Sequence, residues 1–144
     1  MFVHLKNRAL IRVSGSDAET FLQGQLSNDI NKLDKFSVQL NAYCQHQGKI
    51  LVLIWVTKNE DSFFLSFPSD LLELIKSRLQ IFVIMSDVVI EDVSKEYIQI
   101  GSIDEAHKKA LAINDKLSLI IADKNDINEL NMGSVGHWDK ACVD

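Results

Sequence analysis

The sequence has few of the features that mark metal-binding, nucleic-acid-binding or membrane proteins. Its two cysteines, Cys44 and Cys142, lie far apart and in no CxxC spacing, which indicates neither a disulfide framework nor a zinc site. No cluster of lysine and arginine exceeds two residues and the formal net charge is −5, so a nucleic-acid backbone binder is not predicted. The longest apolar runs, 50–56 and 81–85, are too short to span a membrane. We therefore expect a cytoplasmic protein with reduced thiols.

Catalytic signatures are also missing. The chain contains no GxGxxG, Walker or GxSxG pattern, and its four histidines show no HExxH spacing. Glu91 and Asp92 are adjacent on a predicted strand and point to opposite faces, so they cannot act as a carboxylate pair. Cys44 and His46 share a strand face, but a cysteine in such a strand is typically a small core residue. The residues alone predict no catalytic group.

What the sequence does contain is the pattern of one α+β domain. It has 144 residues, of which 47% are hydrophobic and 24% are charged, enough to bury a core without disulfides. Alternating apolar and polar residues predict strands, and apolar residues at spacings of three and four predict helices. The order β-α-β-β-β-α-β-β-α-β favours a mostly antiparallel sheet with flanking helices. The predicted strands are 9–13, 36–46, 49–58, 62–67, 87–94, 97–103 and 116–123, and the predicted helices begin at Ser16, at Ser69 and at Asp104, the last covering 104–113.

The stretch FLQGQLSNDI, residues 21–30, interrupts an apolar helical pattern with several hydrogen-bonding side chains. Ser16 and Glu19 have the spacing of a capping box, which predicts the start of the helix that leads into this stretch. Ser27, Asn28 or Asp29 can cap a second short turn that ends near Leu33. The polar run is therefore at least the boundary between two helical segments.

The same region carries a resemblance to a known family. RALIRVSGSDAETFLQGQLSNDINKL, followed by LNAYCQHQGKILVLIWV, resembles the YgfZ family of folate-binding proteins, which are relatives of the glycine-cleavage T-protein. The resemblance is good over residues 5–94 and loose beyond them. The positions that carry it are Val13, Gly15, Asp17, Ala18, Phe21 to Gln25, Ser27, Asp29, Asn41, Cys44, Gly48 and Lys49.

This resemblance implies a three-domain ring around a channel that holds tetrahydrofolate. It also implies a role in assembly or repair of iron–sulfur proteins, including a tRNA-modifying enzyme. The T-protein's pair of aspartates aligns with Val52 and Leu53, so aminomethyl transfer is not expected of this chain. The family's K-G-C-(Y/F)-x-G-Q-E motif is absent, and Trp138 resembles a tryptophan that opens a later family helix. Residues 1–144 are therefore expected to be the N-terminal part of a longer fold, truncated before its C-terminal domain.

Within that resemblance, the polar stretch gains a second interpretation. Gln25, Asn28 and Asp29 would offer amide and carboxylate groups to a pterin, whose edge carries matching donors and acceptors. Asn41 belongs to the same motif and joins this predicted site. The alternative, that these side chains only cap and tie down loops, stays open.

A strand face completes the predicted folate site. Leu53, Trp55 and Thr57 alternate on one face of their strand and would form its wall. For Trp55, an ordinary core position is the favoured alternative to ligand stacking.

Two other functions remain as alternatives. The first is a folate-dependent one-carbon transferase, against which Val52 and Leu53 count. The second is an interaction domain that uses a sheet face or an edge strand. A truncated ring would expose apolar surface, which predicts self-association.

Overall fold

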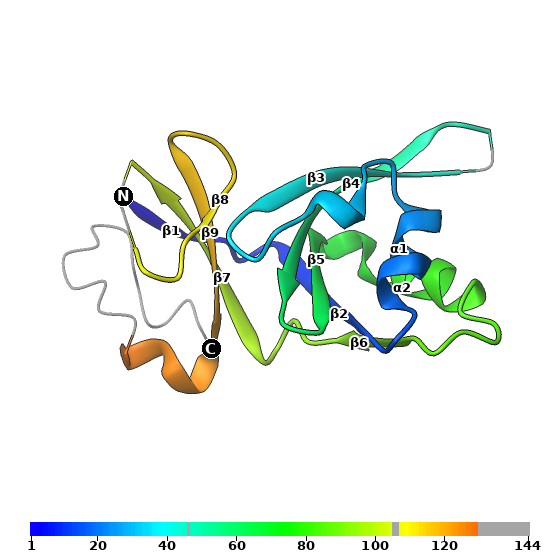
Figure 1. The fold of residues 1–144 in the computed structure, drawn as a ribbon. Helices are drawn as coiled ribbons and strands as arrows, with labels where there is room; N and C mark the ends of the chain where they lie inside the picture. Colours follow the sequence, from blue (N-terminus) through cyan, green and yellow to red (C-terminus); the bar gives the residue numbers. More distant parts are fainter. Residues whose placement is uncertain (46, 105–106, 130–144) are drawn as a thin grey trace.

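The computed structural model describes residues 1–45, 47–104 and 107–129. These ranges form two antiparallel sheets with two α-helices and three short 3-10 helices (Figure 1). The strands are β1 (Phe2–His4), β2 (Arg8–Ser14), β3 (Val38–Cys44), β4 (Ile50–Asn59), β5 (Ser62–Pro68), β6 (Val89–Asp92), β7 (Tyr97–Ile103), β8 (Leu111–Ala112) and β9 (Leu117–Asp123). The helices are α1 (Ala18–Gln25), α2 (Leu72–Ile81), and the 3-10 helices η1 (Ile30–Lys32), η2 (Ser69–Leu71) and η3 (Lys124–Glu129).

The two sheets have different strand orders. One has five strands in the order β3-β4-β5-β2-β6, and the other has four in the order β1-β7-β9-β8. Every strand pair within them is antiparallel. The predicted α+β class with mostly antiparallel strands is confirmed. Division into two sheets was not predicted, because alternation assigns strands but not the partner that each strand chooses.

The main core lies between the five-stranded sheet and the two α-helices. Successive residues of a strand point to opposite faces, so Ile54 and Val56 of β4 enter this core, together with Leu22 of α1 and Ile75 of α2. All four side chains are fully buried. We call this side of the sheet the helix face and the opposite side the outer face.

The four-stranded sheet packs against part of the outer face. Leu10, Phe64 and Val93 form a small buried cluster there, with Tyr97 and Ile121 from the second sheet against it. A buried polar connection lies beside this cluster. Ser66 Oγ donates to the side-chain carbonyl of Gln99, whose amide donates to the carbonyl oxygen of Ala9 at 3.2 Å. Hydrogen bonding of these buried side chains fixes how the two sheets meet.

The predicted helix over 104–113 is wrong in the described part of that segment. Asp104, the first residue of that predicted helix, has φ +55°, a left-handed conformation that does not fit a right-handed helix. Residues 107–110 form a turn, and Leu111 and Ala112 form β8 against β9. The backbone amide of Ala112 also donates to the carbonyl oxygen of Phe36 at 3.0 Å. A segment this short is a marginal helix alone, so sheet pairing overrides its helical pattern.

The start of α1 differs from the predicted capping box. Its N-cap is Asp17, and Ser16 makes no cap bond to the helix. Instead, the Ser16 hydroxyl and backbone amide both donate to the Asp87 carboxylate, at 2.6 and 3.0 Å. The Asp17 carboxylate accepts from the Asp87 backbone amide at 2.8 Å. A distant loop therefore replaces the local cap. Similarly, Ser69 begins η2 rather than α2.

Cys44 is exposed, so the predicted core position is wrong. Burial alternates along β3, with Asn41 and Tyr43 buried, so Cys44 directly after Tyr43 faces away from the main core. His46, His137, Trp138 and Cys142 lie outside the described residues. No helix within the described ranges is long and apolar enough to cross a membrane.

Candidate functional site

The outer face of β4 presents the three predicted wall residues in a row. Leu53, Trp55 and Thr57 all lie on this face, because Trp55 pairs with Ser66 and Thr57 with Phe64 of β5. Their exposure falls along the strand. Leu53 is 51% exposed, Trp55 is half-buried and Thr57 is 1% exposed, because the second sheet covers only the far end of β4. The face therefore changes from an open apolar surface to a covered cleft.

Trp55 is neither a free platform nor an ordinary core residue. The guanidinium of Arg8 lies over its ring, 4.2 Å from the centroid. Arg8 is held there by Ser66, whose hydroxyl accepts from Nε at 2.9 Å and whose carbonyl accepts from Nη2 at 2.7 Å. Burial lowers the pKa of Arg8, although an arginine remains charged in proteins. A cation thus covers part of the ring that a ligand would stack on.

The predicted polar residues form a network along β3. The backbone amide of Asn28 donates to Asn41 Oδ1 at 2.8 Å, and Asn41 Nδ2 donates to Gln39 Oε1 at 3.0 Å. Gln39 Nε2 in turn donates to the carbonyl oxygen of Asp29 at 2.8 Å. The Asp29 carboxylate caps η1 by accepting from the amide of Asn31 at 3.1 Å. These side chains tie the loop to the edge strand, as the capping interpretation predicts.

Gln23 is a structural residue of this loop that the sequence interpretation missed. Its side-chain oxygen accepts from the amide of Ile30 at 2.7 Å, and its amide donates to the carbonyl oxygen of Asn28 at 3.3 Å. Gln25 is half-buried at the end of α1 and its side chain makes no hydrogen bond to another described residue. The sequence signal that could have distinguished Gln23 from Gln25 is the number of residues between each glutamine and the second helical turn.

The structure does not bring the predicted residues together as one site. Asn41 pairs with Ile54, so its side chain lies on the helix face, where it is 1% exposed and hydrogen-bonded. Leu53, Trp55 and Thr57 lie on the outer face. The polar group and the wall are therefore separated by the sheet itself.

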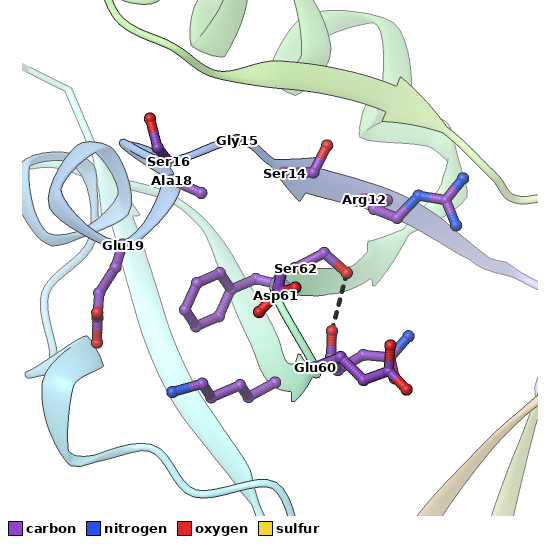
Figure 2. A pocket seen from close by; sticks show the side chains of 12 residues that line it. Arg12, Ser14, Gly15, Ser16, Ala18, Glu19, Glu60, Asp61 and Ser62 are labelled. Atoms are coloured by element: carbon purple, nitrogen blue, oxygen red, sulfur yellow. Dashed lines mark hydrogen bonds between the residues drawn. The ribbon is translucent and has the colours of Figure 1, made fainter.

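A separate cavity of about 630 Å³ lies between the start of α1 and the β4–β5 turn (Figure 2). Arg12 and Lys58 line it together with Glu19, Glu60 and Asp61, so the two signs of charge are mixed. No group of three or more side chains that could hold a metal ion occurs in the part of the chain that the structure describes.

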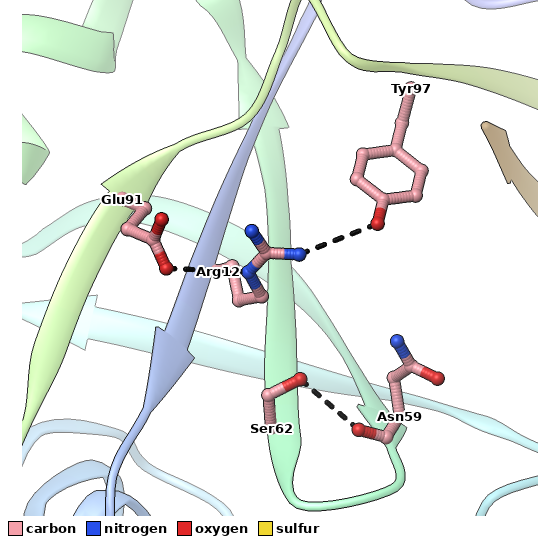
Figure 3. Close-up of polar contacts among 5 residues, drawn as sticks. All are labelled: Arg12, Asn59, Ser62, Glu91 and Tyr97. Carbon is pink, nitrogen blue, oxygen red and sulfur yellow. Dashed lines mark hydrogen bonds and ion pairs between the residues drawn. The ribbon is translucent and has the colours of Figure 1, made fainter. Parts of the chain in front are cut away.

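Arg12 is held beside this cavity by two neighbours (Figure 3). Its Nε lies 3.4 Å from a carboxylate oxygen of Glu91, and Nη1 donates to the Tyr97 hydroxyl at 3.4 Å. The ion pair raises the pKa of Arg12, against the effect of burial. The Glu91 carboxylate partly neutralises the Arg12 guanidinium. The residues that line this cavity therefore indicate no particular ligand or reaction.

Comparison with curated proteins finds relatives of two named kinds, YgfZ proteins and aminomethyltransferases, and one uncharacterized relative. An uncharacterized protein of Haemophilus influenzae is 32% identical over 127 residues, 88% of this chain and 44% of that protein. The tRNA-modifying protein YgfZ of Vibrio atlanticus is 24% identical, over 85% of this chain and 41% of that protein. An aminomethyltransferase of Exiguobacterium sibiricum is 36% identical, over 62% of this chain and 25% of that protein. The chain spans less than half the length of these relatives, and no family model matches it.

A solved structure supports the same relationship at the level of fold. Glycine cleavage system aminomethyltransferase T from Bartonella henselae matches with a TM-score of 0.62 at 17% identity, over 69% of this chain and 27% of that one. The chain therefore shares the fold of part of an aminomethyltransferase. Together with the curated relatives, this supports a relationship to YgfZ-named proteins and aminomethyltransferases.

Proposed function

We propose that the chain belongs to a cytoplasmic, tetrahydrofolate-binding accessory protein of the YgfZ type. Support comes from the two kinds of relatives and from the shared fold. The proposal assigns residues 1–144 to the N-terminal part of that folate-binding fold. It also assigns the whole protein to assembly or repair of iron–sulfur proteins, including tRNA-modifying enzymes, which would be its partners.

The observation that carries the proposal is the outer face of β4. Leu53 offers exposed apolar surface, Trp55 an aromatic ring and Thr57 a hydroxyl, all on one side of one strand. Ligand sites are typically apolar with a few placed polar groups, and this face has that composition. The proposal keeps these three residues as the folate contacts. The hydrogen bonds between the loop and β3 favour a structural role, rather than folate contact, for Asn28, Asp29 and Asn41.

Aminomethyl transfer is not part of the proposal. Val52 is buried in the main core, so it cannot reach a ligand on the outer face. Leu53 is on that face but has no charge to orient the amine of a folate. Methylene transfer from an aminomethyl-bearing carrier to tetrahydrofolate, measured with the protein, would favour the transferase alternative instead.

The direct test is titration of tetrahydrofolate, followed by tryptophan fluorescence in a Trp138→Phe variant, where Trp55 is the remaining tryptophan. A saturable change with a dissociation constant of the order of micromolar is expected. Leu53→Ala should weaken binding by about tenfold, since it removes apolar contact worth roughly 1–2 kcal/mol. Leu74→Ala is the matched control, because Leu74 is similarly exposed but lies on α2. Absence of a saturable signal would overturn the placement of the site in this chain.

Self-association is a second candidate function, and one observation favours it. Leu40 and Leu53 are 54% and 51% exposed on neighbouring strands of the outer face, where Leu40 pairs with Trp55. Adjacent exposed apolar side chains of this kind are typical of interaction surfaces. Light scattering over a range of concentrations tests it, and Leu40→Asp should shift the protein toward a monomer. A monomer at all concentrations would contradict it.

A further inference from the structure

A second cavity, of about 520 Å³, lies where the two sheets meet. Thr57 and Phe64 line it from β4 and β5, and Tyr97 and Ile121 line it from β7 and β9. We call it the inter-sheet cleft. It adjoins the covered end of the outer face, and its size is typical of a cleft that holds a small molecule.

The charge of the inter-sheet cleft is opposite to that of the whole protein. Four lysines line it from three different segments, against two carboxylates, Asp123 and Asp126, while the whole chain has a formal net charge of −5. The lysines are Lys35, Lys58, Lys108 and Lys109. None of their ammonium groups forms an ion pair with another described residue. Four lysines with no ion-pair partner in the described part of the chain raise the local concentration of anions around this cleft.

Thr57 supplies the second, independent observation. The residue is 1% exposed, and its hydroxyl has no hydrogen-bond partner among the described residues. Buried side-chain polar atoms nearly always have a partner, because an unsatisfied hydroxyl loses its hydration without compensation. Thr57 lines the cleft, so we infer that a polar atom bound against this residue supplies the missing partner of the hydroxyl.

Aromatic rings form the apolar part of the wall. Phe64 and Tyr97 contact each other edge to face, with centroids 5.1 Å apart. Phe36 stands at the cleft and is 68% exposed, with the ammonium of Lys35 5.2 Å from its centroid. A ligand with a planar ring would find both an edge and a face to pack against.

We propose that the inter-sheet cleft binds a small aromatic carboxylate. Its carboxylate lies among the lysine ammonium groups and accepts a hydrogen bond from Thr57 Oγ1. Its ring packs on Phe36 and Tyr97. An inorganic anion would neutralise the lysines but would make no contact with the aromatic wall. An aromatic carboxylate is therefore the favoured class of ligand. This inference shares Thr57 with the proposed folate site, and the titrations below test the cleft in the absence of folate.

Isophthalate is a suitable probe, and isophthalamide is its uncharged match. Binding is followed by calorimetry and by two-dimensional NMR of the backbone amides of the whole chain. Isophthalate is expected to shift the amides of residues 57, 64 and 97, whereas isophthalamide and inorganic phosphate should bind at least tenfold more weakly. Equal binding of phosphate would overturn the aromatic part of the proposal, and equal binding of isophthalamide would overturn the carboxylate part.

Substitutions separate a binding role from a purely structural one. Thr57→Val keeps the shape and removes the orphan hydroxyl, so the protein should be as stable as the wild type or more stable while isophthalate affinity falls at least fivefold. Lys108→Gln combined with Lys109→Gln should lower affinity at least tenfold. Lys32→Gln, at an exposed lysine of η1 outside the cleft, should leave it unchanged. Unchanged affinity in Thr57→Val, with fold intact by NMR, would overturn the role of the hydroxyl.

Discussion

Arg8 and Trp55 lie on strands that do not pair with each other, yet the guanidinium of Arg8 is 4.2 Å from the centroid of the Trp55 ring. The strand between them is β5, and its Ser66 holds the guanidinium through its hydroxyl and its carbonyl oxygen. The stack therefore joins β2, β5 and β4 across the outer face. It also sets how much of the ring remains for any other contact.

Replacing Arg8 tests the stability of this stack. Arg8→Gln removes the cation over the ring and the hydrogen bonds to Ser66, and we expect a loss of about 2 kcal/mol in the free energy of unfolding. Arg8→Lys keeps the charge but not the planar fork, so it should lose less. Urea unfolding followed by Trp55 fluorescence, in the Trp138→Phe background, measures both. Equal losses in the two variants would contradict the importance of the fork.

Gly15 shows where the chain requires glycine. It has φ +111°, and a Cβ there would lie 2.2 Å from the carbonyl oxygen of Asp87. Gly15→Ala should therefore reduce the free energy of unfolding by about 3 kcal/mol or more, because backbone strain and a backbone clash act together. Thermal or urea unfolding measures the loss.

Gly24 is the matched control for this substitution. It lies inside α1, and a Cβ there meets nothing within 4 Å. Gly24→Ala should raise the free energy of unfolding by roughly 0.5–1 kcal/mol, since alanine favours a helix over glycine. A similar loss at both positions would contradict the clash at Gly15.

Much of the fold follows from local patterns in the sequence. Alternation correctly predicts that Leu53, Trp55 and Thr57 share a face. Asp29, which caps η1, is one of the three caps that the sequence offers for this turn, beside Ser27 and Asn28. These features depend on neighbours in the chain, which periodicity and cap chemistry describe. The antiparallel pairing of β3 with β4 and of β4 with β5 also joins segments that are neighbours in the chain.

The rest depends on contacts between distant residues. Ser16 bonds to Asp87, 71 residues further along, so its capping box could not be excluded from the local sequence. Leu53 and Thr57 have the same strand face but opposite exposure, because the second sheet covers one and not the other. The sequence analysis predicts Asn41 and Leu53 in the same site, but the strand register places them on opposite faces of the sheet. Local pattern carries no information about these pairings.

Asn41 provides a test of the network along β3. Asn41→Ala removes the acceptor of the Asn28 amide and opens a small gap beside the core, so about 2 kcal/mol of unfolding free energy should be lost. Asn31→Ala is the control, because Asn31 is exposed and only its backbone takes part in the cap. Chemical unfolding compares the two. Equal stability of both variants would contradict a structural role for Asn41.

The pKa of Asp87 offers a prediction in pH. Hydrogen bonds from the hydroxyl and the backbone amide of Ser16 stabilise the carboxylate and hold the pKa of Asp87 below its ordinary value of 3.8. A lowered folded-state pKa means that the ionised form stabilises the fold above the ordinary value, and that this contribution disappears as the pH falls through the lowered pKa. Carbon-detected NMR titration of the Asp87 carboxyl measures it.

Ser16→Ala separates the two hydrogen bonds. The variant loses the hydroxyl and keeps the backbone amide, so the pKa of Asp87 should move back toward 3.8 without reaching it. Its stability should then depend less on pH in the acid range than that of the wild type. An Asp87 titration identical in both proteins would show that the Ser16 hydroxyl does not hold the carboxylate in solution.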